Sequence, residues 1–127
     1  MLLADDYAGI LTALERLLKT DCEVVGSVGD GLALLDAAKR LRPDVIVVDL
    51  NMPALSGLEA CRRIRQTASD IEVILLTASD DKWIERVALG LGAFALIPKS
   101  KVADHLLPAI LKASSRAAAT RLHPKAI

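Results

Sequence analysis

Five polar side chains that could do chemistry each lie just after a short hydrophobic run of the sequence. These residues are Asp5, Asp6, Asp49, Thr77 and Lys99. The hydrophobic runs that precede them span residues 2–4, 45–48, 73–76 and 93–97. If the runs form neighbouring parallel strands, all these polar groups emerge at the carboxyl edge of one sheet. In open α/β sheets, this edge is where ligands bind.

The types of these residues fit a metal ion and an anion bound together. Three carboxylates in one place repel each other unless a divalent cation joins them. A hydroxyl group and an ammonium group beside them suit an anion that arrives with the metal, as a phosphoryl group does. The set therefore indicates a phosphoryl site that depends on Mg2+, an ion that prefers oxygen ligands.

The elements that would position these residues follow from the alternation of hydrophobic runs with amphipathic segments. This pattern is typical of repeated strand–helix units and a parallel sheet. A further strand is predicted at residues 22–28, Asp30 is predicted to cap the second helix, and the third helix is predicted to begin near Gly57. Gly90 and Gly92 should end the fourth helix. The sequence predicts an α/β fold with a doubly wound, five-stranded parallel sheet and five helices.

Helical spacing also predicts which side chains face the core. In the first helix these are Ile10, Leu14, Leu17 and Leu18.

The first strand is short for a central strand, because only four residues precede Asp5. A natural start upstream of Met1 would lengthen it.

The carboxyl-terminal part of the chain departs from a regular helical pattern. Pro108 lies inside the fifth helix, so we expect that helix either to begin late, with Asp104 as its cap, or to be kinked. From Ser114 onward we expect a frayed helix end that runs into a linker through Arg121, His123, Pro124 and Lys125. The predicted domain covers residues 1–117, and residues 118–127 form a tail or the start of a linker.

Composition narrows the class of protein. A chain of 127 residues predicts one domain, and its 16 basic and 16 acidic residues cancel, which argues against non-specific binding to nucleic acid or membrane. With one Tyr, one Trp and one Phe, it lacks the platforms for stacking on single-stranded nucleic acid. Cys22 and Cys61 are unpatterned and are expected to be reduced core residues. We expect a cytoplasmic location, since neither a signal peptide nor a membrane span is evident.

Five separated motifs resemble the receiver (CheY-like) domain of bacterial two-component response regulators, across essentially the whole chain. They are Leu-Leu-Ala-Asp-Asp at 2–6, Val-Val-Asp-Leu-Asn-Met-Pro at 47–53, Gly57, Leu-Leu-Thr-Ala at 75–78 and Gly-Ala-Phe-Ala-Leu-Ile-Pro-Lys-Ser at 92–100. The segments around Asp49 and Lys99 are most similar to the LuxR/NarL-type subfamily, which carries a helix-turn-helix output domain. The resemblance implies the flavodoxin-like fold, with strand order 2-1-3-4-5.

The resemblance also implies a role for each site residue. Asp49 would be the phosphoacceptor, and Thr77 and Lys99 would bind the phosphoryl oxygens. The metal, Mg2+, would be bound directly by Asp6, Asp49 and the main-chain carbonyl of Asn51. Asp5 would act mainly through a metal-bound water.

Each of these residues also has a simpler interpretation. Asp5 and Asp6 could cap a strand end, Asp49 could cap the following turn, and Asn51 could be only a turn former. Thr77 could be an ordinary strand-end hydroxyl, and Lys99 a solvated surface lysine. His105 and His123 lie outside the predicted site and are expected at the surface.

One position departs from the family pattern. Most receivers have an aromatic residue three positions before the lysine, where it changes rotamer together with the threonine, and here that position is Leu96. Phe94 lies two residues earlier, on the same face of the predicted strand. Pro98 precedes Lys99 and Ser100 follows it, so the cis-proline that follows the lysine in many receivers is not expected here.

The sequence therefore predicts a phosphorylation switch that receives its phosphoryl group from a sensor histidine kinase and has no enzymatic activity beyond its own phosphorylation and dephosphorylation. DNA binding would need an output domain outside this chain, and homodimerisation is compatible with the family. A stand-alone receiver and a degenerate interaction module are alternatives. A Mg2+-dependent phosphohydrolase fits less well, because such enzymes usually have an acid where this chain has Asn51.

Overall fold

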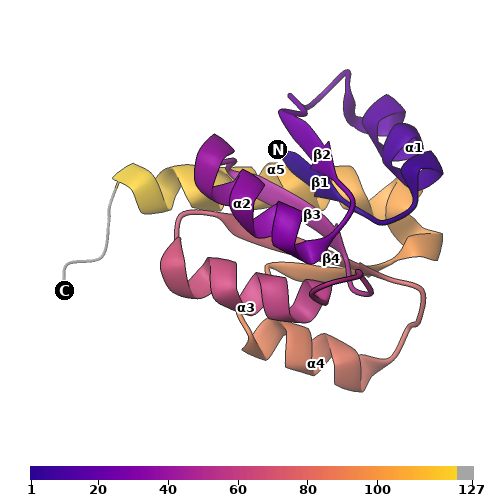
Figure 1. Cartoon of the computed structure of the whole chain (residues 1–127). Helices are drawn as coiled ribbons and strands as arrows, with labels where there is room; N and C mark the ends of the chain where they lie inside the picture. Colours follow the sequence, from indigo (N-terminus) through magenta and orange to yellow (C-terminus); the bar gives the residue numbers. More distant parts are fainter. Residues whose placement is uncertain (123–127) are drawn as a thin grey trace.

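The structure, a computed structural model, describes residues 1–122 of the chain. Five parallel strands form one sheet in the order β2-β1-β3-β4-β5, and five α-helices cover its two faces (Figure 1). The strands are β1 (Leu2–Ala4), β2 (Gly26–Val28), β3 (Val45–Asp49), β4 (Glu72–Thr77) and β5 (Ala95–Pro98). The helices are α1 (Ala8–Leu18), α2 (Gly31–Leu41), α3 (Gly57–Thr67), α4 (Lys82–Gly90) and α5 (Val102–Leu122), with a 3-10 turn η1 at Lys99–Lys101. The predicted fold class and strand order are confirmed.

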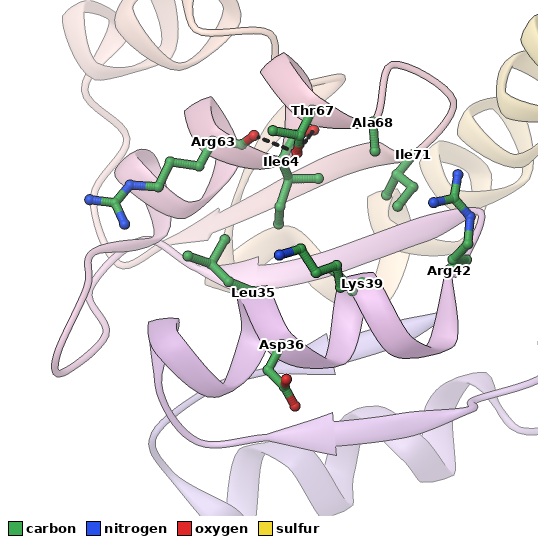
Figure 2. Close-up of a pocket in the computed structure, with 10 residues that line it drawn as sticks. Leu35, Asp36, Lys39, Arg42, Arg63, Ile64, Thr67, Ala68 and Ile71 are labelled. Carbon is green, nitrogen blue, oxygen red and sulfur yellow. Dashed lines mark hydrogen bonds between the residues drawn. The ribbon is translucent and has the colours of Figure 1, made fainter.

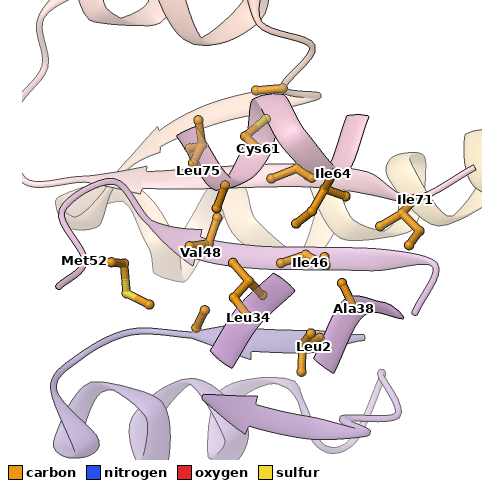
Figure 3. Close-up of a cluster of buried hydrophobic side chains, with 14 of the residues drawn as sticks. Leu2, Leu34, Ala38, Ile46, Val48, Met52, Cys61, Ile64, Ile71 and Leu75 are labelled. Carbon is orange, nitrogen blue, oxygen red and sulfur yellow. The ribbon is translucent and has the colours of Figure 1, made fainter. Parts of the chain in front are cut away.

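Two hydrophobic clusters hold the helices against the sheet. The first lies between the sheet and α2, α3 and α4, and its central members include Leu34, Ile46, Cys61 and Leu75 (Figure 3). The second joins the opposite face of the sheet to α1 and α5. Because β3 and β4 contribute side chains to both clusters, all their residues are buried. A parallel strand that is covered on both faces reads as an uninterrupted hydrophobic run, as these two do.

Local signals in the sequence set most helix ends. Asp30 and Ser56 accept hydrogen bonds from backbone N–H groups in the first turns of α2 and α3, at 2.8 and 3.2 Å. The fourth helix ends at Gly90, and Gly92 follows with a φ of +103°, a left-handed conformation that glycine adopts without steric cost. The predicted roles of Asp30, Gly57, Gly90 and Gly92 are confirmed.

One predicted strand is shorter than expected, and one predicted core residue is exposed. The strand predicted at residues 22–28 is paired only at Gly26–Val28, because its partner β1 offers just three residues for the ladder. Leu17 is exposed rather than buried, so the inward face of α1 is formed mainly by Leu14 and Leu18. Cys61 is buried and Cys22 is half-buried, and neither forms a disulfide.

The last helix is longer and more regular than the sequence suggested. It begins at Val102, so Asp104 lies in its first turn and does not cap it, and Pro108 lies within the helix with an exposed side chain. The fraying expected from Ser114 is not observed, because the helix continues to Leu122. His123, Pro124 and Lys125 lie outside the described residues.

Ion pairs at the amino edge of the sheet explain why α5 continues. Arg116 lies 3.7 Å from the carboxylate of Glu72, a buried residue at the start of β4. Arg121 pairs with Asp70 at 3.0 Å and also with Asp44. Ala113 and Ala117 on the same helix are fully buried, so the small side chains let the helix pack closely while the arginines reach its neighbours.

The loop that connects β3 to α3 is held by glycines at the starts of two helices. The backbone N–H of Gly31 donates to Pro53 O, and that of Gly57 donates to Leu50 O, at 3.2 and 2.8 Å. A Cβ atom on Gly31 would lie 2.2 Å from Leu55 O, and one on Gly57 would lie 2.2 Å from Asp49 O. Only glycine leaves room for these close backbone approaches.

We predict that Gly57→Ala lowers the free energy of unfolding by about 1–3 kcal/mol, since the added methyl group displaces a buried main-chain carbonyl. Gly90→Ala is the matched control, because within residues 1–122 no atom beyond the chain neighbours and the nearby backbone of α4 lies within 4 Å of a Cβ atom there. The control should be neutral or stabilising by up to about 1 kcal/mol. Urea denaturation checks both values. Equal effects of the two substitutions would show that the close approach of Asp49 O to residue 57 does not require glycine there.

Candidate functional site

Four adjacent parallel strands end close together and bring the predicted site residues to one edge of the sheet. Asp5 follows β1, Asp49 ends β3, Thr77 ends β4 and Lys99 follows β5. The register aligns these ends, with Ala4 opposite Val48, Asp49 opposite Leu76, and Thr77 opposite Pro98. Parallel pairing alone therefore makes neighbours of residues that are far apart in sequence.

Three carboxylates form an acidic cluster at this edge. One oxygen from each of Asp5, Asp6 and Asp49 lies within 4.8 Å of the others. Asp5 and Asp49 are buried and Asp6 is exposed. Among the described residues, Asp5 Oδ2 is buried without a hydrogen-bond partner. A buried carboxylate oxygen without a partner raises the free energy of the folded protein, and a bound cation would lower it again. The clustered carboxylate oxygens are also the ligands that hard divalent cations prefer.

Lys99 supplies the positive charge beside the acidic cluster. Its Nζ atom lies 3.3 Å from Asp49 Oδ2 and 3.5 Å from Asp5 Oδ2, and its side chain is half-buried. The contact with Asp5 is an ion pair without hydrogen-bond geometry, so Asp5 Oδ2 still lacks a donor. Lys99 is therefore not a solvated surface lysine.

The same local turn orients three of the site side chains. In each case, a side-chain oxygen at the strand end accepts a hydrogen bond from the backbone N–H two residues later. Asp5 accepts from Tyr7 at 2.9 Å, Asp49 from Asn51 at 3.5 Å, and Thr77 from Ser79 at 3.1 Å. Such turns are typical of Asp, Asn, Ser and Thr. They fix one oxygen of each aspartate and leave the other directed to the cluster.

These donors were not identified from the sequence, because a backbone N–H group leaves no trace in residue identity. The available signal was the position of an Asp or Thr two residues before a loop amide. Asn51 is exposed in the loop after Asp49, and the hydrogen bond from its own N–H makes it a turn former as well as a candidate ligand. His105 is exposed on α5, as expected.

Burial is the main reason that the pKa of Asp5 lies above its ordinary value, and the charges of Asp49 and Asp6 add to this effect. The Tyr7 N–H and the Lys99 ammonium group oppose it without cancelling it. The folded protein therefore holds the Asp5 proton more tightly than the unfolded chain does. The contribution of Asp5 to stability consequently falls as the pH rises from its unfolded pKa through its folded pKa, and stays low above that range.

Phe94 does not share the strand face of Leu96, so that expectation is wrong. Leu96 is buried in the cluster on the α2, α3 and α4 side of the sheet. Phe94 packs against the cluster on the α1 and α5 side, where its ring lies 5.9 Å from the Arg116 guanidinium. Alternation of faces applies only within β5, which begins at Ala95. Phe94 therefore does not lie behind Thr77 on the face of Leu96.

A comparison with known proteins agrees with this geometry. Residues 1–111 match the family model of the response regulator receiver domain. The chain belongs to this family. It is a receiver domain of a two-component response regulator, and the flavodoxin-like order of its strands is the order of that fold.

Individual relatives show the same relationship. Response regulator MprA of Mycobacterium leprae is 39% identical over 111 residues, which cover 87% of this chain and 48% of the relative. A receiver domain protein from Clostridium thermocellum has a TM-score of 0.84 at 30% identity, covering 93% of this chain and 95% of that one. A LuxR-family DNA-binding response regulator from Staphylococcus aureus has a TM-score of 0.82 at 25% identity, covering 89% and 96%.

The chain thus spans about half the length of the curated relatives that it matches. Within residues 1–122, none of the helices is long and apolar enough to cross a membrane.

We predict that Asp5→Asn stabilises the metal-free protein at neutral pH, by on the order of 1 kcal/mol, because it removes a buried charge beside two like charges. The asparagine Oδ1 atom can still accept the hydrogen bond from Tyr7. The same substitution should reduce the rise in melting temperature caused by added Mg2+.

Thermal unfolding with and without Mg2+ measures both effects. Asp36→Asn is the control, since Asp36 is an exposed aspartate on α2 that lies outside the cluster. If metal-free Asp5→Asn were less stable than wild type, repulsion between Asp5 and the other two carboxylates would not be what destabilises this site.

Proposed function

We propose that this receiver domain is a phosphorylation-dependent switch that accepts a phosphoryl group on Asp49 from a histidine kinase. The ion pair between Asp49 and Lys99, beside the acidic cluster, carries the proposal. Asp5 also contacts Lys99, but it is only 1% exposed and one of its oxygens is held at 2.9 Å by Tyr7. Asp6 is exposed and forms no ion pair with Lys99 among the described residues. Asp49 is slightly more exposed than Asp5, at 6%, and its Oδ2 atom lies 3.3 Å from Lys99 Nζ, a cation for the phosphoryl oxygens.

The metal proposed for the site is Mg2+. Asp6, Asp49 and the main-chain carbonyl of Asn51 would hold it directly, and Asp5 would hold it through water. When bound, Mg2+ neutralises the carboxylates and the phosphoryl oxygens. This assignment would also give the unpartnered Asp5 Oδ2 atom a favourable neighbour.

The transfer itself needs little covalent chemistry from the chain. A carboxylate oxygen of Asp49 forms a bond to phosphorus while the phosphorus–nitrogen bond of the kinase phosphohistidine breaks, which gives an acyl phosphate and a free imidazole. Lys99 transfers its contact from the carboxylates to a phosphoryl oxygen, and the Thr77 hydroxyl donates to another. Positioning and charge neutralisation supply most of the catalysis in such transfers.

The new charge on Asp49 would draw Thr77 inward and rearrange α4 and β5. This is a local electrostatic change that biases a two-state element. Leu96 fills the buried place where most receivers have an aromatic residue, so the rearrangement here would depend on Thr77 and on movement of an aliphatic side chain. A degenerate receiver would be expected to lack a cation beside the phosphoacceptor, and Lys99 is present.

We also propose partners for the switch, a histidine kinase as phosphoryl donor and an output domain that it controls. The family relationship supports a sensor histidine kinase as the phosphoryl donor in the cytoplasm. The matched relatives are about twice as long as the matched segment, which supports an output domain beyond this chain. The residues around Asp49 and Lys99 favour a LuxR/NarL-type, helix-turn-helix output and transcription control, with homodimerisation as a compatible step. In this proposal residues 1–117 form the receiver, and residues 118–127 lead to the output domain, with residues 118–122 continuing α5.

We predict that incubation with acetyl phosphate and Mg2+ adds one phosphoryl group to the wild-type chain, measured as intact mass. Asp49→Asn should prevent the addition, because the amide is not a nucleophile of comparable strength. Lys99→Ala should lower the yield by at least about tenfold, since it removes the cation that neutralises the phosphoryl oxygens.

Lys101→Ala is the matched control for Lys99→Ala, because Lys101 is an exposed lysine in the same 3-10 turn. Phosphorylation of Asp49→Asn at wild-type yield would place the phosphoacceptor elsewhere. Multiple turnovers of a phosphate ester, with release far beyond one equivalent, would instead support a phosphohydrolase.

A further inference from the structure

A second concave site lies between α2 and α3, at the opposite end of the sheet from Asp49. Its floor is formed by Leu35, Ala38, Ile64, Ala68 and Ile71, and its volume is about 600 Å³. Ile71 directly precedes β4, so this α2–α3 groove opens toward the amino edge of the sheet. A volume of this size lies within the range of small-molecule sites in proteins.

The floor of the groove is apolar and fixed in place. Ala38, Ile64 and Ile71 are almost fully buried and belong to the hydrophobic cluster under α2 and α3. Figure 2 shows Leu35 and Lys39 on α2 facing Ile64 and Thr67 on α3 across the groove. The apolar surface of the floor that is open to water belongs mainly to Leu35 and Ala68, which are half-buried, and an aliphatic or aromatic group that lay there would cover it.

The rim of the groove is positively charged. Lys39, Arg42 and Arg63 all line it. Within residues 1–122, Lys39 makes no ion pair, and Arg42 lies 3.6 Å from Asp70, which is already bound by Arg121 at 3.0 Å. Arg63 pairs at 3.2 Å with Glu59, which Arg62 also binds. Much of this positive charge is therefore available to a ligand.

Two features with negative character also lie at the groove, and the cations outweigh them. Asp36 lines it, but Figure 2 shows its carboxylate directed away from the floor, and it pairs with Arg40 at 3.7 Å. The carboxyl ends of α2 and α3 carry partial negative charge. Lys39 and Arg42 lie at the end of α2 and offset this charge there.

Arg42 lines the groove from the position just after the last residue of α2. Arg42 ends α2 with a φ of +46°, a left-handed conformation in which glycine is strongly preferred. The chain holds a long cationic side chain there despite the steric cost, at the mouth of the groove, with 61% of that side chain exposed.

We propose that the α2–α3 groove binds a free small amphipathic anion, with an apolar body on the floor and a carboxylate or phosphate group at Lys39 and Arg42. The combination of an apolar floor and a cationic rim selects this class over neutral and cationic molecules. The site is independent of Asp49, Thr77 and Lys99, so it does not depend on the proposed phosphorylation.

Titration of the 15N-labelled chain with monomeric decanoate, followed by backbone amide NMR, tests the proposal. We expect saturable shift changes at Leu35, Lys39, Thr67 and Ile71. Decylammonium should bind at least about tenfold more weakly, because charge selects the ligand. Decyl phosphate in place of decanoate determines which anionic group the rim prefers. Equal responses to decanoate and decylammonium, or shifts confined to other surfaces, would overturn the proposal.

Variants of residues that line the α2–α3 groove identify the side chains that bind decanoate. Lys39→Glu should weaken decanoate binding by about tenfold, while Lys112→Glu, on the exposed side of α5, should leave it unchanged. Thr67→Phe should block the groove with an uncharged group. The substitution should leave the fold intact, because Thr67 is exposed at the end of α3 and, within residues 1–122, its hydroxyl donates only to carbonyls of its own helix. Asp49→Asn should bind decanoate as wild type does, which separates this test from that of the switch. Wild-type binding by both groove variants would contradict the site.

Discussion

Crowding of like charge at the carboxyl edge of the sheet is the constraint on which the rest of the structure depends. The parallel register brings Asp5 and Asp49 to adjacent strand ends, and burial removes most of the water that would screen their repulsion. The two apolar clusters must therefore hold β1 and β3 together against this repulsion. Lys99 compensates only in part, since the pKa of Asp5 is still raised and its Oδ2 atom lacks a donor. An incoming divalent cation would relieve the repulsion that folding creates and would offset the charge of an added phosphoryl group.

The backbone around this edge determines where the charges point. Repeated i to i+2 turns hold one oxygen each of Asp5, Asp49 and Thr77. Close glycine contacts at Gly31 and Gly57 fix the loop that carries Asn51. The site is thus arranged by short local contacts at the ends of rigid strands, which is the usual way to place functional groups accurately.

Much of this arrangement could be predicted from the sequence, because buried parallel strands and the polar residues that end them leave a plain pattern. The fold, the strand order and the proximity of Asp5, Asp49 and Lys99 all follow from that pattern and the family resemblance. Most of the failures have one physical origin, since they depend on tertiary contacts between distant segments. The end of α5 is set by Arg116 with Glu72 and by Arg121 with Asp44 and Asp70, which no local signal reveals. The short pairing of β2 is likewise set by its partner. Phe94 changes face for a local reason, because β5 begins at Ala95 and not at residue 93.

A crystal structure of the chain with Mg2+ and beryllofluoride, an analogue of the phosphoryl group, would test the central claim most directly. We expect beryllofluoride on Asp49, with Lys99 Nζ and Thr77 Oγ1 within hydrogen-bond distance of its fluorine atoms. We also expect a metal ion between Asp6, Asp49 and the Asn51 carbonyl. Beryllofluoride on another residue, or Lys99 still paired with Asp5 and Asp49 beside an unmodified site at saturating analogue, would contradict the claim.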